Sequence, residues 1–484
     1  MRPTVRIFFD GALAGDIDAL TLGDPVKGQL DNASYPLADD FADVSDDVRS
    51  VSLRRGRSNE TNAVDAGTAT VVLDNRARLY DPTAGASISP YAAAIVPRKE
   101  ITVSINDAAV FTGQVEDWDL QYSKSGDSVT LAKASDGFTL LTQQTLASGA
   151  GATGLSSSVI CDTASAADWP MGRIDFDEGT AFVGAHTIDQ GTKVLPYLQK
   201  ITDTEQALLY IGKDGTLTFR DRISPRRTFG PRFADDGTGI PFTNIEIQYG
   251  TEFLYTQIEV EYPGGSASAQ SASAAVAAYG LTEYKLDTFL PDLSSASVIA
   301  EFLAERYGEP TFRITGVEVE IDSLSASQKA DMLELELGDG VEVVFTPNNL
   351  GDPIFRELAV DSIEHDITPG SHIVALKFFE PFLISRSGSV SGSSSTAGSV
   401  TGTVGYFGEI TGSESTSGSV TGTVGYVGTI TGSQGTSGFV LGGEGNVGII
   451  TGTSSTAGSV TGTKTEFGFF TLDTSQLDGP SILQ

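Results

Sequence analysis

The chain has 484 residues, of which 63 are acidic and 30 basic, and its formal net charge is −33. A chain this long exceeds what one hydrophobic core usually serves, so we expect three or four domains. The acidic surplus argues against a phosphate-binding surface, which requires clustered Lys and Arg. The single cysteine, Cys161, cannot form an intrachain disulfide, so stability must come from packing and from association of copies.

Residues 1–140 are predicted to form an N-terminal β-barrel domain. Short β-branched or alternating runs are separated there by turn residues such as Asp10-Gly11 and Asn106-Asp107. Several strands at this spacing are typical of a barrel or a sandwich. The first fifteen residues alternate like a strand and lack a long apolar stretch, so we expect no signal peptide. No run reaches the roughly 18 apolar residues of a membrane span.

Residues 141–240 are predicted to be a mixed α/β domain. The small and polar segment 149–158 indicates a loop or linker. Apolar residues at helical spacing predict a helix that begins near Val194 and includes Ile201. Two apolar runs that flank Lys213-Asp214-Gly215 predict a β-hairpin.

Residues 241–386 are predicted to form a second β-barrel domain with one helix. Ser294 or Ser295 would cap that helix at its start, and Gly308 would end it. The preceding segment 264–278 is rich in Ser and Ala and has few bulky side chains, so we expect a mobile loop there.

Residues 387–472 form a repeat, which a tail of residues 473–484 follows. Glycine recurs every ten residues from Gly388 to Gly468, and two positions after each one stands a branched or bulky apolar residue. Alternate units differ, so the full period is twenty residues. A decapeptide with one large apolar residue cannot build a core alone, whereas stacked copies can.

Two folded forms of this repeat remain open. One is a β-solenoid within one chain, and the other is a β-helix shared by three chains, which we favour. If each unit made one turn, each would rise about 4.8 Å. A third possibility for the repeat is a disordered Gly/Ser/Thr linker. The aromatic residues Tyr406, Phe407 and Tyr426 could stack on sugars of a cell surface. We favour the alternative, in which they fill the core of the repeat.

Two of the three histidines lie near acidic residues, which suggests a metal site, but the strand-like sequence around them argues against one. His365 and His372, with Glu364 and Asp366, carry ligand atoms, while His186 stands alone. In a strand, however, successive side chains point to opposite faces. We therefore expect these four to be exposed or hydrogen-bonded surface residues.

The acidic residues offer further candidates without a specific motif. Asp175-Phe-Asp-Glu-Gly179 has carboxylates at alternate positions, as a structural Ca²⁺ site requires. Glu116 and Asp117 could serve a glycosidase, but close acidic pairs are expected among 63 acids. Phosphate-loop, metalloprotease and nucleophile-elbow motifs are absent. Cys161 is expected to be a buried small hydrophobe. We therefore predict no enzyme, with no catalytic, cofactor-binding or metal-binding residues.

Several motifs together resemble the minor tail proteins of siphophages, which occur widely in phages of actinobacteria. The resemblance covers roughly residues 40–380. The matching segments are Ser50–Thr61, which contains Arg54-Arg55-Gly56-Arg57, then Asp65–Arg76, Leu79–Pro82, Ser89–Tyr91, Pro97–Arg98, Phe111–Gly113, Val115–Trp118, Lys213–Arg220, Ala304–Pro310 and Ile363–Gly370.

This resemblance implies a hub protein of the phage baseplate or tail tip. Such proteins form trimers whose tube-like barrels make a pseudo-sixfold ring that adapts the tail tube to a threefold spike. The implied partners are two further copies, the distal tail protein, the tail tube, other tail-tip or fibre proteins and a host cell-surface glycan, with DNA only in transit. The implied location is the virion tail tip, after synthesis in the host cytoplasm. Alternatives are a receptor-binding fibre and a polysaccharide hydrolase.

Overall fold

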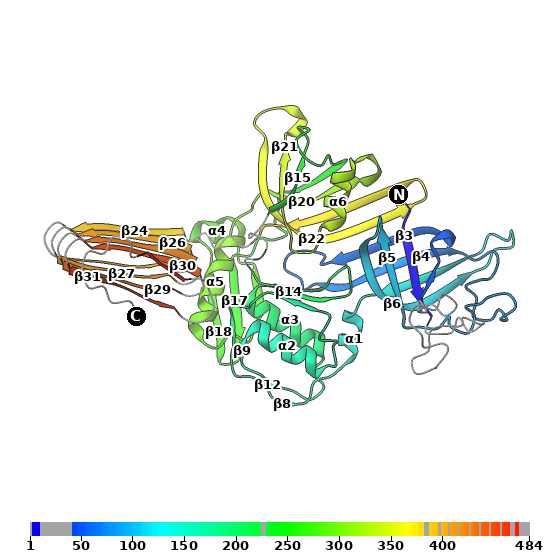
Figure 1. The fold of residues 1–484 in the computed structure, drawn as a ribbon, viewed down its shortest axis with the longest axis horizontal. Coiled ribbons are helices and arrows are strands. Elements are labelled where there is room, and N and C mark those ends of the chain that lie inside the picture. Colours follow the sequence, from blue (N-terminus) through cyan, green and yellow to red (C-terminus); the bar gives the residue numbers. More distant parts are fainter. Residues whose placement is uncertain are drawn as a thin grey trace, which may run out of the picture. The chain divides into compact units, whose positions relative to one another are not determined.

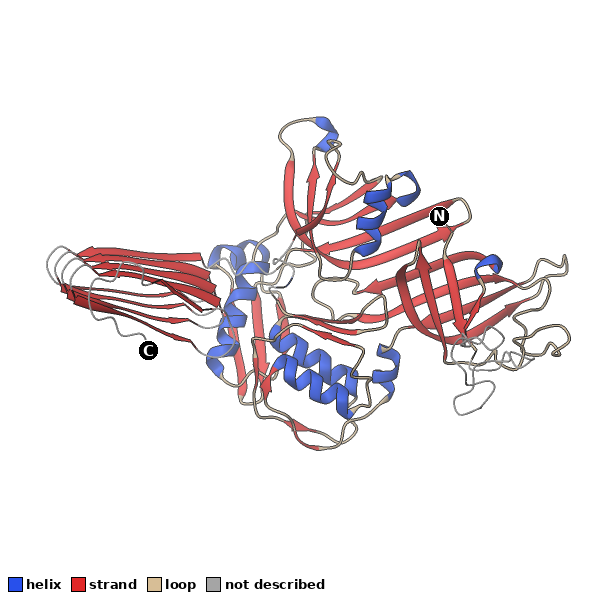
Figure 2. Ribbon diagram, in the orientation of Figure 1, coloured by secondary structure: helices blue, strands red, loops and turns tan. Residues whose placement is uncertain are grey.

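The computed structural model describes residues 2–9, 41–222, 224, 229–381 and the strands of the repeat between residues 387 and 473. The chain divides into two compact units, Met1–Pro381 and Phe382–Gln484. The fold is mainly β, with helices grouped in a few places (Figure 2). The domain boundaries expected near residues 140 and 240 stay predictions.

One sheet of thirteen strands organises the first unit (Figure 1). Its amino-terminal half-sheet runs in the order β3, β4, β7, β6, β5, β1, β2, and its carboxy-terminal half-sheet contains β22, β23, β20, β16, β21 and β15. The first half comprises β1 (Thr4–Phe8), β2 (Phe41–Asp43), β3 (Val48–Gly56), β4 (Asp65–Asp74), β5 (Lys99–Ile105), β6 (Ala108–Gln121) and β7 (Val129–Ser135). The second comprises β15 (Phe229–Ala234), β16 (Asn244–Gln248), β20 (Arg313–Glu320), β21 (Gly340–Phe345), β22 (Ile354–Thr368) and β23 (Ser371–Phe379).

The sheet forms where apolar residues alternate with polar ones. In β5, Ile101, Val103 and Ile105 are fully buried, while the residues between them are partly exposed. Successive side chains of a strand point to opposite faces, so this alternation gives each strand one core face. The same pattern in β4 and β20 continues the core across both half-sheets.

Our prediction of two separate β-barrels is wrong, because the two sets of strands belong to one open sheet. To close the first set into a barrel, its last strand, β2, would have to pair with the outer edge of β3. That edge of β3 already pairs with β22. Between β2 and β3 stands only the short 3-10 helix Ser45–Asp47, and the described residues of β2 pair with β1 alone.

Between the half-sheets, the chain forms a mixed α/β region. The predicted helix is confirmed as α3 (Val194–Glu205), and the predicted hairpin as β13 (Leu208–Ile211) with β14 (Leu217–Arg220). The loop expected at 149–158 is wrong, since β8, β9 and the start of α2 lie there. The remaining elements are α1 (Phe138–Gln143), β8 (Gly149–Ala150), β9 (Gly154–Leu155), α2 (Ser156–Ala166), β10 (Ile174–Phe176), β11 (Phe182–Val183) and β12 (Thr187–Ile188).

A small three-stranded sheet with order β18-β17-β19 follows and packs against a helix. The predicted helix is confirmed as α5, but Asp292 caps it by accepting a hydrogen bond from Ser295 N. The mobile loop expected at 264–278 is wrong, because it forms β18 and most of α4. These elements are β17 (Gln257–Tyr262), β18 (Gly265–Gln270), α4 (Ser273–Tyr279), β19 (Glu283–Asp287) and α5 (Leu293–Tyr307). Helix α6 (Ala326–Glu334) lies between two short 3-10 helices, Ile321–Ser323 and Pro347–Asn349.

In the second unit, the strands of the repeat alternate between two parallel sheets. One sheet has the order β24-β26-β28-β30-β32 and the other β25-β27-β29-β31. Residues twenty positions apart pair in register over most of the repeat, as Val390 does with Ile410. The strands are β24 (Ser387–Ser394), β25 (Gly398–Val404), β26 (Phe407–Glu414), β27 (Ser417–Val424), β28 (Val427–Gln434), β29 (Ser437–Glu444), β30 (Val447–Ser454), β31 (Ala457–Lys464) and β32 (Phe470–Asp473).

The strand pairing corrects the expectation that each ten-residue unit makes one turn. Up to β31, each strand pairs with the strand twenty residues away, so two decapeptides complete one step; the last pair, β30 with β32, is offset by 22 residues. At about 4.8 Å for each step, the four steps from β24 to β32 span roughly 19 Å.

Candidate assembly site at the seam between the half-sheets

The two half-sheets meet at an antiparallel pair of strands, β3 and β22, which we call the seam. Six residue pairs form it, from Gly56 with Ser362 to Val51 with Ile367. The strand β3 carries the Arg54-Arg55-Gly56-Arg57 segment, and every arginine of that segment pairs with a carboxylate on the carboxy-terminal side. The seam is therefore fixed by charge as well as by backbone hydrogen bonds.

Gly56 permits the close approach of the two strands. Its φ is +108°, a conformation that side chains rarely adopt. A Cβ at this position would lie 2.3 Å from the carbonyl oxygen of Asp361 and 2.6 Å from the Cα of Ser362. Both atoms belong to the backbone and cannot rotate away, so only glycine fits here.

Arg55 joins the sheet to the segment after helix α6. Its guanidinium donates to Glu336 at 2.6 Å, and its side chain is only 3% exposed. Glu336 also accepts a hydrogen bond from the backbone N of Lys213 at 3.0 Å. The ammonium of Lys213 donates to the carbonyls of Leu333 and Glu334, both at 2.7 Å. Burial lowers the pKa of Lys213.

Arg57 forms the second buried pair of the seam. It donates through Nε to Asp361, whose side chain is 3% exposed. The guanidinium also lies 4.8 Å from the ring centroid of Phe379, within cation–π range. Burial raises the pKa of Asp361, and the positive charge of Arg57 opposes that rise.

Glu60 accepts hydrogen bonds from two arginines that come from different elements. Arg306 of α5 donates to it at 2.7 Å, and Arg313 of β20 donates to its other oxygen. The Glu60 side chain is 6% exposed. Burial alone would raise its pKa, but the charges of Arg306 and Arg313 hold the pKa below its usual value. Glu60 thus ties the loop after β3 to the carboxy-terminal half-sheet and to α5.

Arg54 makes a different kind of pair. Its Nε lies 3.0 Å from Glu364, but both side chains are more than 40% exposed. Exposed pairs contribute about 0–1 kcal/mol, whereas breaking a buried pair costs about 3–5 kcal/mol. The buried pairs of Arg55, Arg57 and Glu60 therefore dominate the seam.

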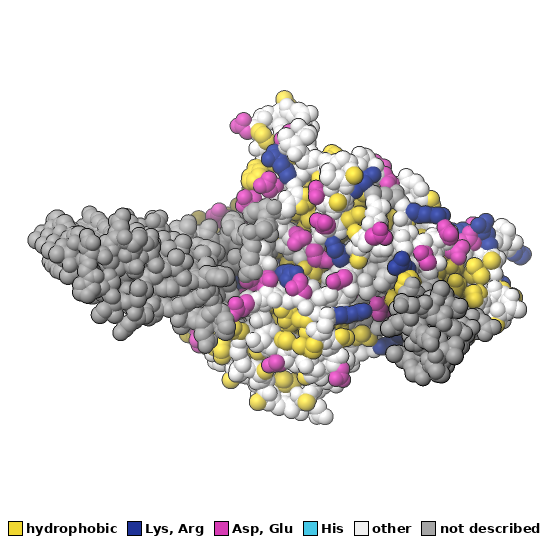
Figure 3. Space-filling view, viewed as in Figure 1, with side chains coloured by type: hydrophobic (Ala, Val, Ile, Leu, Met, Phe, Trp, Pro, Cys, Tyr) yellow, Lys and Arg dark blue, Asp and Glu magenta, His cyan; other side chains and the backbone are white. Residues whose placement is uncertain are grey.

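A cavity of about 280 Å³ lies beside these buried pairs. Glu60, Arg313 and Asp361 line it together with Lys377 and Glu246. Glu252 and Glu380 also line the cavity, so carboxylates outnumber the two cations of the lining. On the visible face of the first unit, Lys and Arg are interspersed with Asp and Glu (Figure 3).

The structure brings two of the predicted histidines together, inside the sheet. His365 Nδ1 lies 3.0 Å from His372 Nε2, and the two residues are 5% and 0% exposed. The expected surface position is wrong, because both rings point to the core face of β22 and β23. Glu364 lies on the other face, beside Arg54. Burial lowers the pKa of His365, and it lowers the pKa of His372 to about 4.

The other predicted ligand residues are engaged with protein groups. Asp175 accepts from Arg220 at 2.5 Å, and Asp177 lies 3.6 Å from the same guanidinium. Glu116 accepts from Ser135 at 3.2 Å. Cys161 is half-buried, which corrects the expected full burial. Within the described residues, no cluster of three or more His, Cys, Asp or Glu could hold a metal ion.

The aromatic residues proposed as sugar platforms remain untested. Tyr406 and Tyr426 lie outside the described residues, and only the backbone of Phe407 is described, in β26. In the described part of the chain, no helix is long and apolar enough to span a membrane.

No family model and no curated protein matches this sequence. Similar solved structures include the 43 kDa tail protein of prophage MuSo2 from Shewanella oneidensis, at 12% identity and a TM-score of 0.48 over 69% of this chain and 94% of that one. The tail protein from Neisseria meningitidis MC58 has 12% identity and a TM-score of 0.49, over 78% and 95% of the two chains. Prophage tail protein gp18 from Listeria monocytogenes EGD-e has 11% identity and a TM-score of 0.41, over 80% and 97%. All three of these structures are of tail proteins.

The partners of the seam could not be predicted from the sequence. The Arg54–Arg57 segment stands out as a motif, but Glu336 lies 281 residues from Arg55 and Asp361 lies 304 residues from Arg57. No local pattern marks those two carboxylates among 63 acidic residues.

Proposed function

We propose that this protein is a structural component of a phage tail tip and acts as a trimeric hub. The observation that carries the proposal is the seam, through which one chain supplies two half-sheets in one continuous sheet. Three such chains would supply six half-sheets around a common axis. That number matches the pseudo-sixfold ring that the motif resemblance implies.

The chemistry of the seam supports a scaffold and not a catalyst. The buried carboxylates Glu60 and Asp361 and the partly buried Glu336 each accept a hydrogen bond from an arginine. Groups paired in this way fix the geometry of the strands that carry them. We infer that the protein acts through contacts with neighbouring tail proteins and lets DNA pass.

We further propose that the repeat forms a stalk. Strands that pair in register every twenty residues support an ordered rod over a flexible linker. An inner strand such as β28 has both edges paired with strands of its own chain, β26 and β30, which favours a single-chain solenoid over the three-chain β-helix expected from the sequence. Identical pairs such as Gly408 with Gly428 place small residues in continuous columns.

Two measurements test the hub. The purified chain should have a native mass of about 152 kDa by light scattering, three times its 50.6 kDa. Antibodies against residues 41–222 should label the distal end of the tail in electron micrographs of intact particles. A monomer that is absent from purified particles contradicts the proposal.

The repeat also suits a second role as a receptor-binding fibre. Deleting residues 387–484 separates the two roles. Particles that assemble but no longer adsorb to the host indicate a receptor binder. Particles that assemble and adsorb normally leave the repeat as a spacer.

A further inference from the structure

A separate open hollow of about 450 Å³ lies between helix α3 and the turn that joins β17 to β18. Its walls come from four places in the chain: the start of β12, α3, the β17–β18 turn and the end of β19. None of its lining residues takes part in the seam. The volume is within the range of about 300–1,000 Å³ that small-ligand sites occupy.

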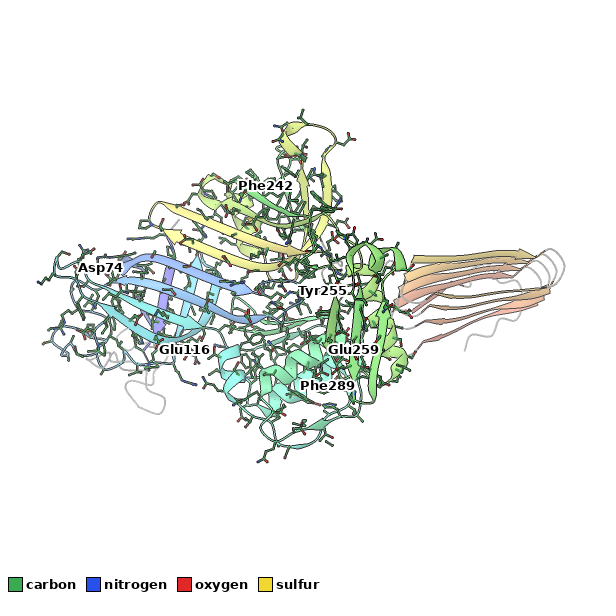
Figure 4. All side chains as sticks on the ribbon, turned by 180° about the vertical axis from the view of Figure 1, so that it is seen from behind. Asp74, Glu116, Phe242, Tyr255, Glu259 and Phe289 are labelled. Carbon is green, nitrogen blue, oxygen red and sulfur yellow. The ribbon has the colours of Figure 1, made fainter. Side chains whose placement is uncertain are left out.

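The floor of the hollow is a rigid aromatic stack. The rings of His186 and Phe289 lie 3.9 Å apart at 24° to each other. His186 uses both ring nitrogens, one with the carbonyl of Gly184 and one with the hydroxyl of Tyr197, each at 2.8 Å. Figure 4 shows Phe289 where the helices meet the small sheet. The floor is thus fixed by side-chain packing and hydrogen bonds.

Charged groups of both signs stand above this floor. The Lys200 ammonium lies 2.6 Å from Asp287 and 4.4 Å from the ring centroid of Phe289. The Lys200 side chain is 29% exposed and the Asp287 side chain 60%, so both retain sites that face water. An ammonium has three donors and a carboxylate about four acceptor sites. One shared hydrogen bond therefore leaves most of their capacity for a ligand.

The opposite wall is the turn after β17. Glu261 is exposed at the end of β17, and its carbonyl accepts hydrogen bonds from Thr288 N and Oγ1 at 2.9 and 2.7 Å. The half-buried ring of Tyr262 lies across the turn, where a Cβ on Gly264 would stand only 2.6 Å from the ring. The absence of a side chain at Gly264 thus leaves room for the tyrosine ring, and Tyr262 lines the hollow.

We propose that this hollow binds a neutral sugar unit of a glycan. Asp287 and Glu261 accept hydrogen bonds from sugar hydroxyls, Lys200 donates to them, and the Tyr262 ring packs against the C–H face of the sugar. Two carboxylates against one ammonium disfavour an anionic ligand, and the charged lining disfavours an apolar one. The inference goes beyond the proposed hub function, because a scaffold needs no such site.

The test is saturation-transfer NMR on the full chain with glucose, galactose, mannose and N-acetylglucosamine as separate probes. For an open site that holds one sugar ring, we expect a Kd on the order of 1 mM for the preferred sugar. Tyr262→Ala and Asp287→Asn should each weaken binding about tenfold or more. Tyr279→Ala is the matched control, because Tyr279 is 48% exposed and lies outside the hollow.

Two outcomes overturn the proposal. One is the absence of transfer to any of the four sugars with the unmodified chain. The other is equal transfer with Tyr262→Ala, Asp287→Asn and Tyr279→Ala, once far-UV circular dichroism shows that all three are folded. Neither outcome bears on the hub, which is tested by native mass and by labelling of particles.

Discussion

At the scale of single residues, buried charge is the feature that distinguishes this molecule. Glu60, with 6% of its side chain exposed, pairs with two guanidinium groups whose side chains are 11% and 10% exposed. A buried pair of this kind adds little net stability over an apolar packing, but it makes any wrong arrangement expensive. We infer that the Arg54–Arg57 segment specifies which strands pair, in addition to stabilising the pairing.

Glu60→Gln is expected to lower the free energy of unfolding by about 3–5 kcal/mol, because it removes the carboxylate charge that the buried guanidinium groups of Arg306 and Arg313 share. Glu364→Gln removes an exposed partner of Arg54 and should cost less than about 1 kcal/mol. Urea unfolding followed by far-UV circular dichroism compares the two. Equal losses would show that burial does not decide the strength of these pairs.

The buried histidines predict a loss of stability in acid. The folded pKa of His372 is about 4, against 6.5 for the free side chain, because burial disfavours its charged form. Between these values the unfolded chain binds a proton that the folded chain does not, so stability falls as pH falls from 6.5 to 4. Asp322 opposes the shift at His372, whereas Arg55 and Lys213 reinforce it at His365.

His372→Gln should flatten this part of the pH dependence, because glutamine does not titrate. The measurement is the melting temperature at several values between pH 7 and pH 4, for the variant and the unmodified chain. If both chains lose stability in parallel over that interval, His372 does not cause the acid sensitivity.

At the scale of elements, the seam requires the two strands to approach closely at one position. Gly56→Ala places a methyl group against the backbone of Asp361 and Ser362, and we expect it to destabilise the chain by several times the cost of Gly126→Ala. Gly126 also has a positive φ, +83°, but nothing lies within 4 Å of its added Cβ. Its substitution should cost only about 1 kcal/mol from backbone strain.

The comparison of Gly56→Ala with Gly126→Ala isolates the steric contribution, because both glycines have left-handed backbone conformations. Chemical unfolding of the two variants gives the difference directly. If Gly56→Ala lowers the free energy of unfolding no more than Gly126→Ala does, then β3 and β22 can separate slightly without loss of stability.

The repeat makes an independent prediction about register. Deleting residues 417–436 removes one full period and keeps each later strand in its own sheet, whereas deleting 417–426 moves every later strand to the other sheet. We expect the twenty-residue deletion to keep the protease resistance of the repeat and the ten-residue deletion to lose it. Limited proteolysis with mass spectrometry reads out both. Equal resistance would imply that the two sheets are interchangeable.

At the scale of the whole molecule, the net charge of −33 must be accommodated when copies associate. Like charges repel over about 10 Å at 0.1 M salt and over longer distances at lower salt. We therefore expect the trimer to become tighter as NaCl rises from about 20 to about 300 mM, the reverse of an interface held by surface ion pairs. Sedimentation equilibrium measures this, and dissociation on adding salt would contradict it.

Local signals in the sequence were sufficient for elements that depend on neighbouring residues. The apolar spacing at Val194 predicts α3, and the Lys213-Asp214-Gly215 turn predicts its hairpin. The sequence also shows the twenty-residue period of the repeat, but the pairing of strands twenty residues apart came from the structure. The prediction of a mobile loop at 264–278 is wrong, because it takes the small residues of that segment as a sign of flexibility. Its strand, β18, pairs with β17 and packs against α5, partners that lie outside the segment.

The sequence by itself thus determined the β-rich class, the period of the repeat and the arginine-rich segment, because each depends on residues close together in the chain. Only the tertiary structure decided that the strands form one open sheet, that the arginines pair with carboxylates 281 and 304 residues away, and that two histidines are buried together. The physical reason is that strand partners and buried counter-charges are chosen by proximity in the folded chain. That proximity leaves no trace in local composition.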